Sequence, residues 1–158
     1  MTMRKLLLLL ASHAVALAAG VALGIYLLPI LTAPQGPAAA DLRTASTQAR
    51  YTGEFKRDLK GSDALHWGEG RVTVSPAAVA LQGRLAPGPA YRLYLVPEFV
   101  ETKSDFVRLK ERSLAVGDIK TFENFLVPLP AGTPLENYTT VVVWCEAFSQ
   151  FITAARYR

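Results

Sequence analysis

The sequence contains one cysteine and two histidines among its 158 residues. A lone cysteine cannot form an intramolecular disulfide, so Cys145 is a core residue, an intermolecular partner or a free functional thiol. A structural zinc site uses four ligands of the cysteine and histidine type. Beyond residue 33 only Cys145 and His66 are of these types, which excludes such a site unless carboxylates or a second chain contribute.

Motifs of the common enzyme classes are absent as well. There is no Gly-x-Ser-x-Gly, no phosphate-binding glycine loop and no His-Glu-x-x-His. The formal charge is +4, and Arg4 and Lys5 supply two of these charges, so the rest of the chain carries about +2, too little for a nucleic-acid-binding surface. We therefore expect neither a classical enzyme nor a nucleic-acid partner, and a redox role through the thiol stays open.

Residues 6–33 form an uncharged run of 28 residues. As an α-helix this run would be about 42 Å long, against about 30 Å for the hydrocarbon core of a bilayer. Tyr26 lies near its far end, where an aromatic ring suits the headgroup region. We therefore expect residues 1–33 to be the transmembrane signal anchor of a single-pass membrane protein.

A cleaved signal peptide is the alternative, because Ala38-Ala39-Ala40 offers a small-x-small site before Asp41. The apolar region of a signal peptide is usually about 7 to 15 residues long, and this run is about twice that length, which favours the uncleaved anchor. Arg4 and Lys5 precede the run and predict a cytoplasmic N-terminus. With no disulfide, this arrangement predicts a bacterial inner membrane and a periplasmic domain.

The remainder divides into a linker and one domain. Residues 34–50 are rich in proline and alanine and predict a linker. Residues 51–158 contain short alternating segments separated by turn signals, most clearly at 91–96 and 138–148. About seven or eight such strands, without a strand–helix rhythm, predict an all-β fold, an antiparallel β-sandwich or small barrel preceded by one transmembrane helix. Only residues 103–112, with apolar residues three apart, favour a short helix.

Cys145 lies in the strongest of the predicted strands. There Val143 and Cys145 share one face, and Trp144 and Glu146 share the other. We expect the face with Glu146 to be the wetter one, which turns the thiol toward the core. A buried cysteine behaves as a small apolar residue with a raised pKa, whereas a redox thiol or soft ligand must be a thiolate. Both interpretations stay open at this point.

His66 opens the segment His66-Trp67-Gly68-Glu69-Gly70, whose glycines suggest a turn or bulge beside a strand. It is the one side chain of the domain whose unperturbed pKa lies near neutrality. It is therefore a candidate to ligate a metal or haem or to tune a nearby thiolate. The alternative is a hydrogen-bonded turn residue.

Several features recur in the order of a known domain family. They are Gly53-Glu54-Phe55 at the start, Gly61, a strand after Gly70, the strand 91–96, the segment 125–130 ending in Leu-Pro, and Tyr138 to Cys145 followed by Phe148 and Phe151. Residues 51–158 in this way resemble the DM-thirteen domain, a family described as electron transfer. The resemblance implies a β-sandwich-like extracellular module whose characteristic cysteine is Cys145, acting as a bare thiol or holding a prosthetic group such as haem. The charged stretch 100–120 has no place that we assign in this pattern.

Two hypotheses follow. The first is a membrane protein that displays a DM-thirteen-like domain and takes part in electron transfer or thiol redox with an envelope partner, with Cys145 as the redox group and His66 beside it. The second is a non-catalytic envelope module for binding or scaffolding, in which Cys145 is a core residue. Its working surface would be Trp67, Tyr94 and Phe99, and its partner a protein, a metal or a lipid.

Overall fold

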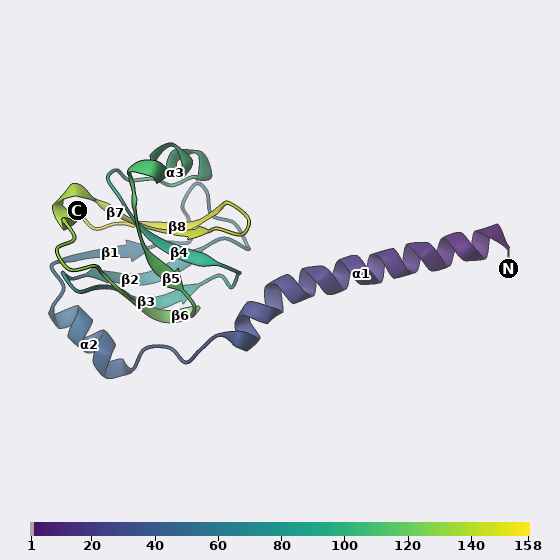
Figure 1. Cartoon of the computed structure of the whole chain (residues 1–158), viewed down its shortest axis with the longest axis horizontal. Coiled ribbons are helices and arrows are strands. Elements are labelled where there is room, and N and C mark those ends of the chain that lie inside the picture. Colours follow the sequence, from purple (N-terminus) through teal and green to yellow (C-terminus); the bar gives the residue numbers. More distant parts are fainter. Residues whose placement is uncertain (1) are drawn as a thin grey trace.

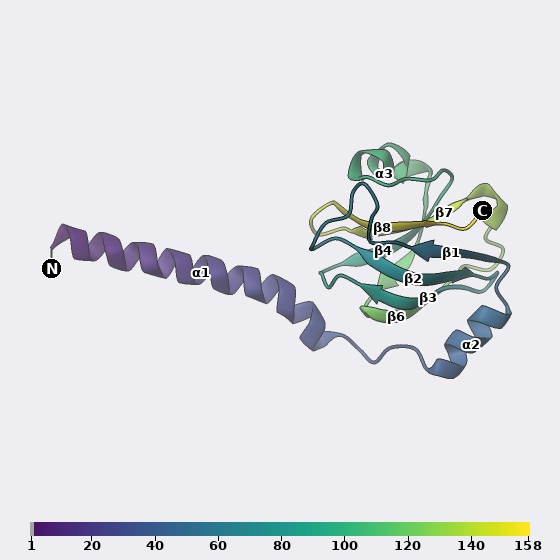
Figure 2. The ribbon, with the colours of Figure 1, turned by 180° about the vertical axis from the view of Figure 1, so that it is seen from behind.

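The computed structural model describes residues 2–158, which form one long helix followed by a β domain (Figure 1). Helix α1 (Met3–Thr32) has 30 residues, and none of its side chains is buried. It is long and apolar enough to cross a membrane and lies near the N-terminus. Viewed from behind, α1 projects away from one end of the domain (Figure 2).

Residues 2–158 contain eight strands in two four-stranded sheets, and every paired strand is antiparallel. The first sheet has the order β1 (Tyr51–Phe55), β2 (Gly68–Val74), β3 (Ala78–Leu85), β6 (Glu123–Pro128). The second has the order β5 (Leu114–Ile119), β4 (Tyr91–Val96), β7 (Thr140–Cys145), β8 (Gln150–Arg156). The predicted antiparallel β-sandwich preceded by a helix is confirmed.

The main core lies between the two sheets. Alternate residues of each strand point into it, as the period of two requires. The inward set includes Val72 and Val74 of β2, Leu93 of β4, and Val143 and Cys145 of β7. Burying one large aliphatic side chain of this kind contributes about 1.5–3 kcal/mol. The predicted inward orientation of the thiol is therefore correct.

A second apolar cluster covers the outer face of the β4–β7–β8 sheet. Helix α3 (Lys103–Leu109) and the 3-10 turn η1 (Lys110–Arg112) lie above this face (Figure 1). Phe106 and Leu109 of α3 pack there against Trp144, which is 1% exposed. The expectation of a wet face is therefore wrong at Trp144, because residues 103–112 of the charged stretch fold over the sheet.

Two further elements differ from the expected organisation. Helix α2 (Ala39–Thr47) lies inside the segment expected to be linker, and its Leu42 and Ala45 pack on Ala80 of β3. Strand β7 stops at Cys145, where the predicted strand runs on to residue 148, because residues 146–149 form the turn to β8. A short 3-10 turn, η2 (Leu135–Asn137), precedes β7.

Candidate functional site

Cys145 is the last residue of β7, and its neighbours across the sheet are Tyr91 of β4 and Gln150 of β8. Its side chain lies at the end of the inter-sheet core, and the residue is 3% exposed. The Sγ atom donates a hydrogen bond to the carbonyl oxygen of Pro89, 3.1 Å away in the β3–β4 loop. The thiol is therefore buried but has a polar neighbour.

Burial raises the pKa of the Cys145 thiol, and the nearby Glu146 carboxylate acts in the same direction. The backbone amides of Phe148 and Ala147 oppose this rise without cancelling it. Because the thiolate is the nucleophile and the metal ligand, the thiol at neutral pH is in its less reactive form. Chemistry at this sulfur needs a group that takes its proton.

A pocket of about 450 Å³ lies in front of the thiol, at the end of the sandwich that faces α1. Its size is within the range of about 300–1,000 Å³ that ligand pockets occupy. Four segments supply its walls: α1, the β1–β2 loop, the β3–β4 loop and the β7–β8 hairpin. The lining residues are Ala22, Ile25, Tyr26, Leu65, His66, Pro87, Gly88, Pro89, Tyr91, Cys145, Phe148, Gln150 and Ile152. The fold thus brings both candidate residues, Cys145 and His66, to one pocket.

The orientation of His66 is set by Asp63 in the same loop. Nδ1 of His66 lies 2.8 Å from Oδ2 of Asp63, and Oδ1 of Asp63 accepts hydrogen bonds from the amides of Leu65 and His66 at 2.7 and 2.9 Å. The hydrogen bond from His66 lowers the pKa of the Asp63 carboxyl. A carboxylate at Nδ1 favours the tautomer that carries its proton there, which leaves Nε2 as an acceptor.

Haem is the prosthetic group that the sequence resemblance implies, and the residues present fit it in kind. Histidine nitrogen and cysteine sulfur are both ligands of haem iron, and His66 and Cys145 line the same pocket. The carboxylate of Asp63 on Nδ1 is the usual partner of a ligating histidine. Within residues 2–158 no three His, Cys, Asp or Glu side chains form a group that could hold a metal ion. Of these four residue types, the pocket is lined by His66 and Cys145.

A second polar cluster, which the sequence analysis missed, lies under α3 and η1 on the outer face of the sheet. The Tyr94 hydroxyl donates a hydrogen bond to Oε1 of Glu146, and Nζ of Lys110 lies 2.7 Å from Oε2. Burial and the bond to Glu146 raise the pKa of Tyr94 to about 12. The Lys110 ammonium also lies 5.2 Å from the ring centre of Trp144. These side chains come together only because α3 and η1 fold over the sheet, so no local sequence pattern predicts the cluster.

The surface proposed for a binding module is only partly exposed. Tyr94 is 5% exposed, so its place in that surface is wrong, because α3 covers it. Trp67 lies under the guanidinium of Arg57, 3.4 Å from the ring centre, and Phe99 under that of Arg156 at 4.7 Å. These two aromatic rings are half-buried beneath arginines.

The β domain matches the model of a known protein family. The family model described as "Electron transfer DM13" matches residues 54–157, which run from β1 to the end of β8. No match was found among curated proteins or among solved structures. The matched segment covers about two thirds of the chain and includes Cys145 and His66. The chain therefore belongs to the electron transfer DM13 family.

Proposed function

We propose that this protein is a membrane-anchored electron-transfer component with Cys145 as its redox-active group. Helix α1 anchors it in the cell inner membrane, with the N-terminus in the cytoplasm and the β domain on the periplasmic side. The observation that carries the proposal is that Cys145 and His66 line one pocket. Family membership supports electron transfer as the general role.

The chemistry begins with the proton of the thiol. We assign the role of proton acceptor to Nε2 of His66, since Nδ1 is bound to Asp63 and His66 lines the same pocket as the thiol. The thiolate then attacks one sulfur of a partner protein's disulfide, forms the new S–S bond, and releases the other partner sulfur as a thiolate. If haem were bound in this pocket, Cys145 and His66 would hold its iron, and the haem would supply a one-electron carrier.

The test uses the full chain purified in detergent. The visible spectrum reports haem, and the rate of alkylation by iodoacetamide reports whether Cys145 is reached in the folded protein. We expect either a haem absorption band or labelling of the folded chain, with His66→Asn slowing the labelling. His13→Asn is the matched control, since His13 lies in α1, and should leave the rate unchanged. A colourless protein that labels only after unfolding contradicts the proposal.

Anchoring and sidedness are tested separately. We expect the full chain to stay with membranes after washing at high pH and high salt. Protease added to intact spheroplasts should digest the β domain if it faces the periplasm. A chain released by the wash, or protected from protease until the membrane is opened, contradicts this part of the proposal.

The burial of Cys145 favours a second candidate function. A thiol that is 3% exposed and hydrogen-bonded to a backbone carbonyl also suits an inert core residue of a non-catalytic envelope module for binding or scaffolding. In that case Cys145→Ala leaves function intact, while truncation of Trp67 or Phe99 removes partner binding.

A further inference from the structure

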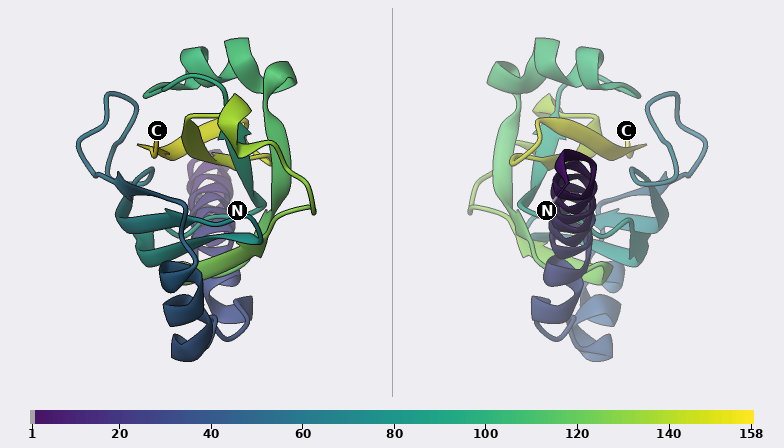
Figure 3. Two further views of the ribbon diagram at one scale, coloured as in Figure 1. Left: turned by 90° about the vertical axis from the view of Figure 1, so that its left-hand side faces the viewer. Right: turned by 90° about the vertical axis from the view of Figure 1, so that its right-hand side faces the viewer.

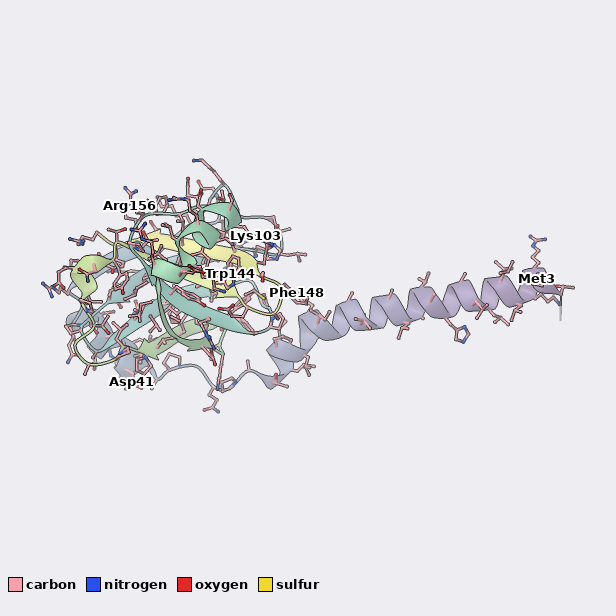
Figure 4. All side chains as sticks on the ribbon, turned by 45° about the horizontal axis from the view of Figure 1, so that its top comes forward. Met3, Asp41, Lys103, Trp144, Phe148 and Arg156 are labelled. Carbon is pink, nitrogen blue, oxygen red and sulfur yellow. The ribbon has the colours of Figure 1, made fainter. Side chains whose placement is uncertain are left out.

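Two large apolar side chains are exposed at the end of the β domain that faces α1. Leu65 in the β1–β2 loop is 60% exposed, and Phe148 in the β7–β8 turn is 55% exposed. Beyond α1, the one other large apolar residue exposed in the described chain is Val107 on α3, at 53%. Figure 4 shows Phe148 at the end of the domain next to α1. Apolar exposure in the domain is therefore concentrated where the helix departs.

The depth of these side chains along α1 follows from the pocket that they share with the helix. Leu65 and Phe148 line it together with Ile25 and Tyr26 of α1. A hydrocarbon core of about 30 Å takes about 20 helical residues, so a span that begins at Leu6 ends close to residue 25. Tyr26 then lies at the boundary where aromatic rings suit the headgroups. Leu65 and Phe148 are therefore at the level of the bilayer surface.

The end of α1 and its C-cap residue Ala33 lie next to the same end of the domain. Pro29 and Ala33 are half-buried against the end of the sandwich, where α1 and the β3–β4 loop line common pockets. The segment 87–89 of that loop is uncharged. In the end-on views of Figure 3, α1 is seen nearly along its own axis, behind the β domain on the left and in front of it on the right. The exposed apolar surface of the helix thus continues onto Leu65 and Phe148.

We propose that this end of the domain docks on the lipid bilayer that α1 crosses, with Leu65 and Phe148 inserted among the headgroups. The inference rests on the proposed anchoring by α1. An amphipathic surface of this kind lies with its apolar groups at the boundary between headgroups and acyl chains. The pocket in front of Cys145 then opens at the membrane surface, so its reaction partner reaches the thiol from the lipid side of the domain.

The test measures contact with lipid in the full chain. Four variants are made in a Cys145→Ser background, so that each has one cysteine: Leu65→Cys, Phe148→Cys, Val107→Cys and Leu23→Cys. A bimane fluorophore is attached to that cysteine. The protein is reconstituted in vesicles of phosphatidylcholine and phosphatidylglycerol, with or without a lipid that bears a nitroxide near the headgroup end of its acyl chain. Near-ultraviolet circular dichroism checks that each variant is folded.

We expect the nitroxide lipid to quench the fluorophore at Leu65, at Phe148 and at Leu23 of α1, but not at Val107. Val107 is the matched control, because its side chain is about as exposed as the other two but lies on α3. If Leu23 is quenched while Leu65 and Phe148 behave like Val107, the helix is inserted and the docking proposal is wrong. If Leu23 is also unquenched, the anchoring itself is wrong, and docking falls with it.

Discussion

The Sγ atom of Cys145 lies 3.1 Å from the carbonyl oxygen of Pro89 and donates a hydrogen bond to it. A thiolate has no proton to donate, so this contact favours the protonated thiol, as burial does. Pro89 belongs to the β3–β4 loop, which also walls the pocket. The reactivity of the sulfur is therefore tied to the position of this loop.

The first prediction concerns the pH dependence of the thiol. Because the pKa of Cys145 is raised in the folded chain, less thiolate is present at neutral pH than in an unfolded chain, whose thiol has a pKa of about 8.5. We expect iodoacetamide to label folded protein without haem more slowly than denatured protein at pH 7. The difference between the two labelling rates should narrow as the pH rises above the pKa of Cys145 in the folded chain. Faster labelling of the folded chain at pH 7 would contradict the raised pKa.

A second prediction addresses the cluster under α3. Burial acts to raise the pKa of Glu146, but hydrogen bonds from Lys110 and Tyr94 lower it overall. We expect Glu146→Gln to reduce the free energy of unfolding by about 1–3 kcal/mol at pH 7, since two hydrogen bonds to a charged group are weakened. Denaturant titration followed by near-ultraviolet circular dichroism measures this loss.

The same cluster has a defined pH dependence. A carboxyl whose folded pKa is depressed contributes stability above its unfolded pKa, about 4.3, and loses it as the pH falls through the folded value. The difference between wild type and Glu146→Gln should therefore shrink in acid. Asp118→Asn is the control, because the Asp118–Arg92 pair is 56% and 43% exposed and such surface pairs contribute about 0–1 kcal/mol. If Glu146→Gln and Asp118→Asn reduced the free energy of unfolding by the same amount at pH 7, a special role for Glu146 would be excluded.

A third prediction compares neighbouring residues of α3. Phe106 is 0% exposed, and its ring centre lies 4.9 Å from that of Trp144, whereas Val107 is 53% exposed. Phe106→Ala should destabilise the protein by about 3–5 kcal/mol by leaving a cavity over Trp144. Val107→Ala should change stability by about 0.5 kcal/mol or less. Thermal unfolding of both variants checks this, and a small effect of Phe106→Ala would show that α3 is not part of the core.

The fourth prediction concerns the Gly-x-Phe segment at the start of the domain. A Cβ atom on Gly53 would lie 2.6 Å from the backbone oxygen of Arg156, where β1 and β8 approach each other at the sandwich edge. Gly53→Ala must push these strands apart, and we expect a loss of about 1–3 kcal/mol. Glu54→Ala, at an exposed position of the same strand, should be nearly neutral. Denaturant unfolding of the two variants gives the comparison.

Local patterns in the sequence predict much of the architecture. Strict alternation over 91–96 predicts β4 with its observed bounds, and alternation around Cys145 predicts that the thiol points inward. An uncharged run longer than a bilayer predicts α1. These features depend on residues close together in the chain, because the periods of strands and helices are local properties.

The features that depend on residues far apart in the chain were decided only by the tertiary structure. Trp144 is buried because α3 packs over the sheet. The alternation of residues in β7 carries no information about that packing. Likewise, the shared pocket of Cys145 and His66 exists because loops from both sheets and the end of α1 meet at one end of the sandwich. Periodicity fixes which way a side chain faces along its own strand, whereas its surroundings depend on non-local packing. The sequence by itself therefore determined a β-sandwich with an inward-facing thiol behind a long apolar helix, and only the packing placed a histidine and the helix beside that thiol.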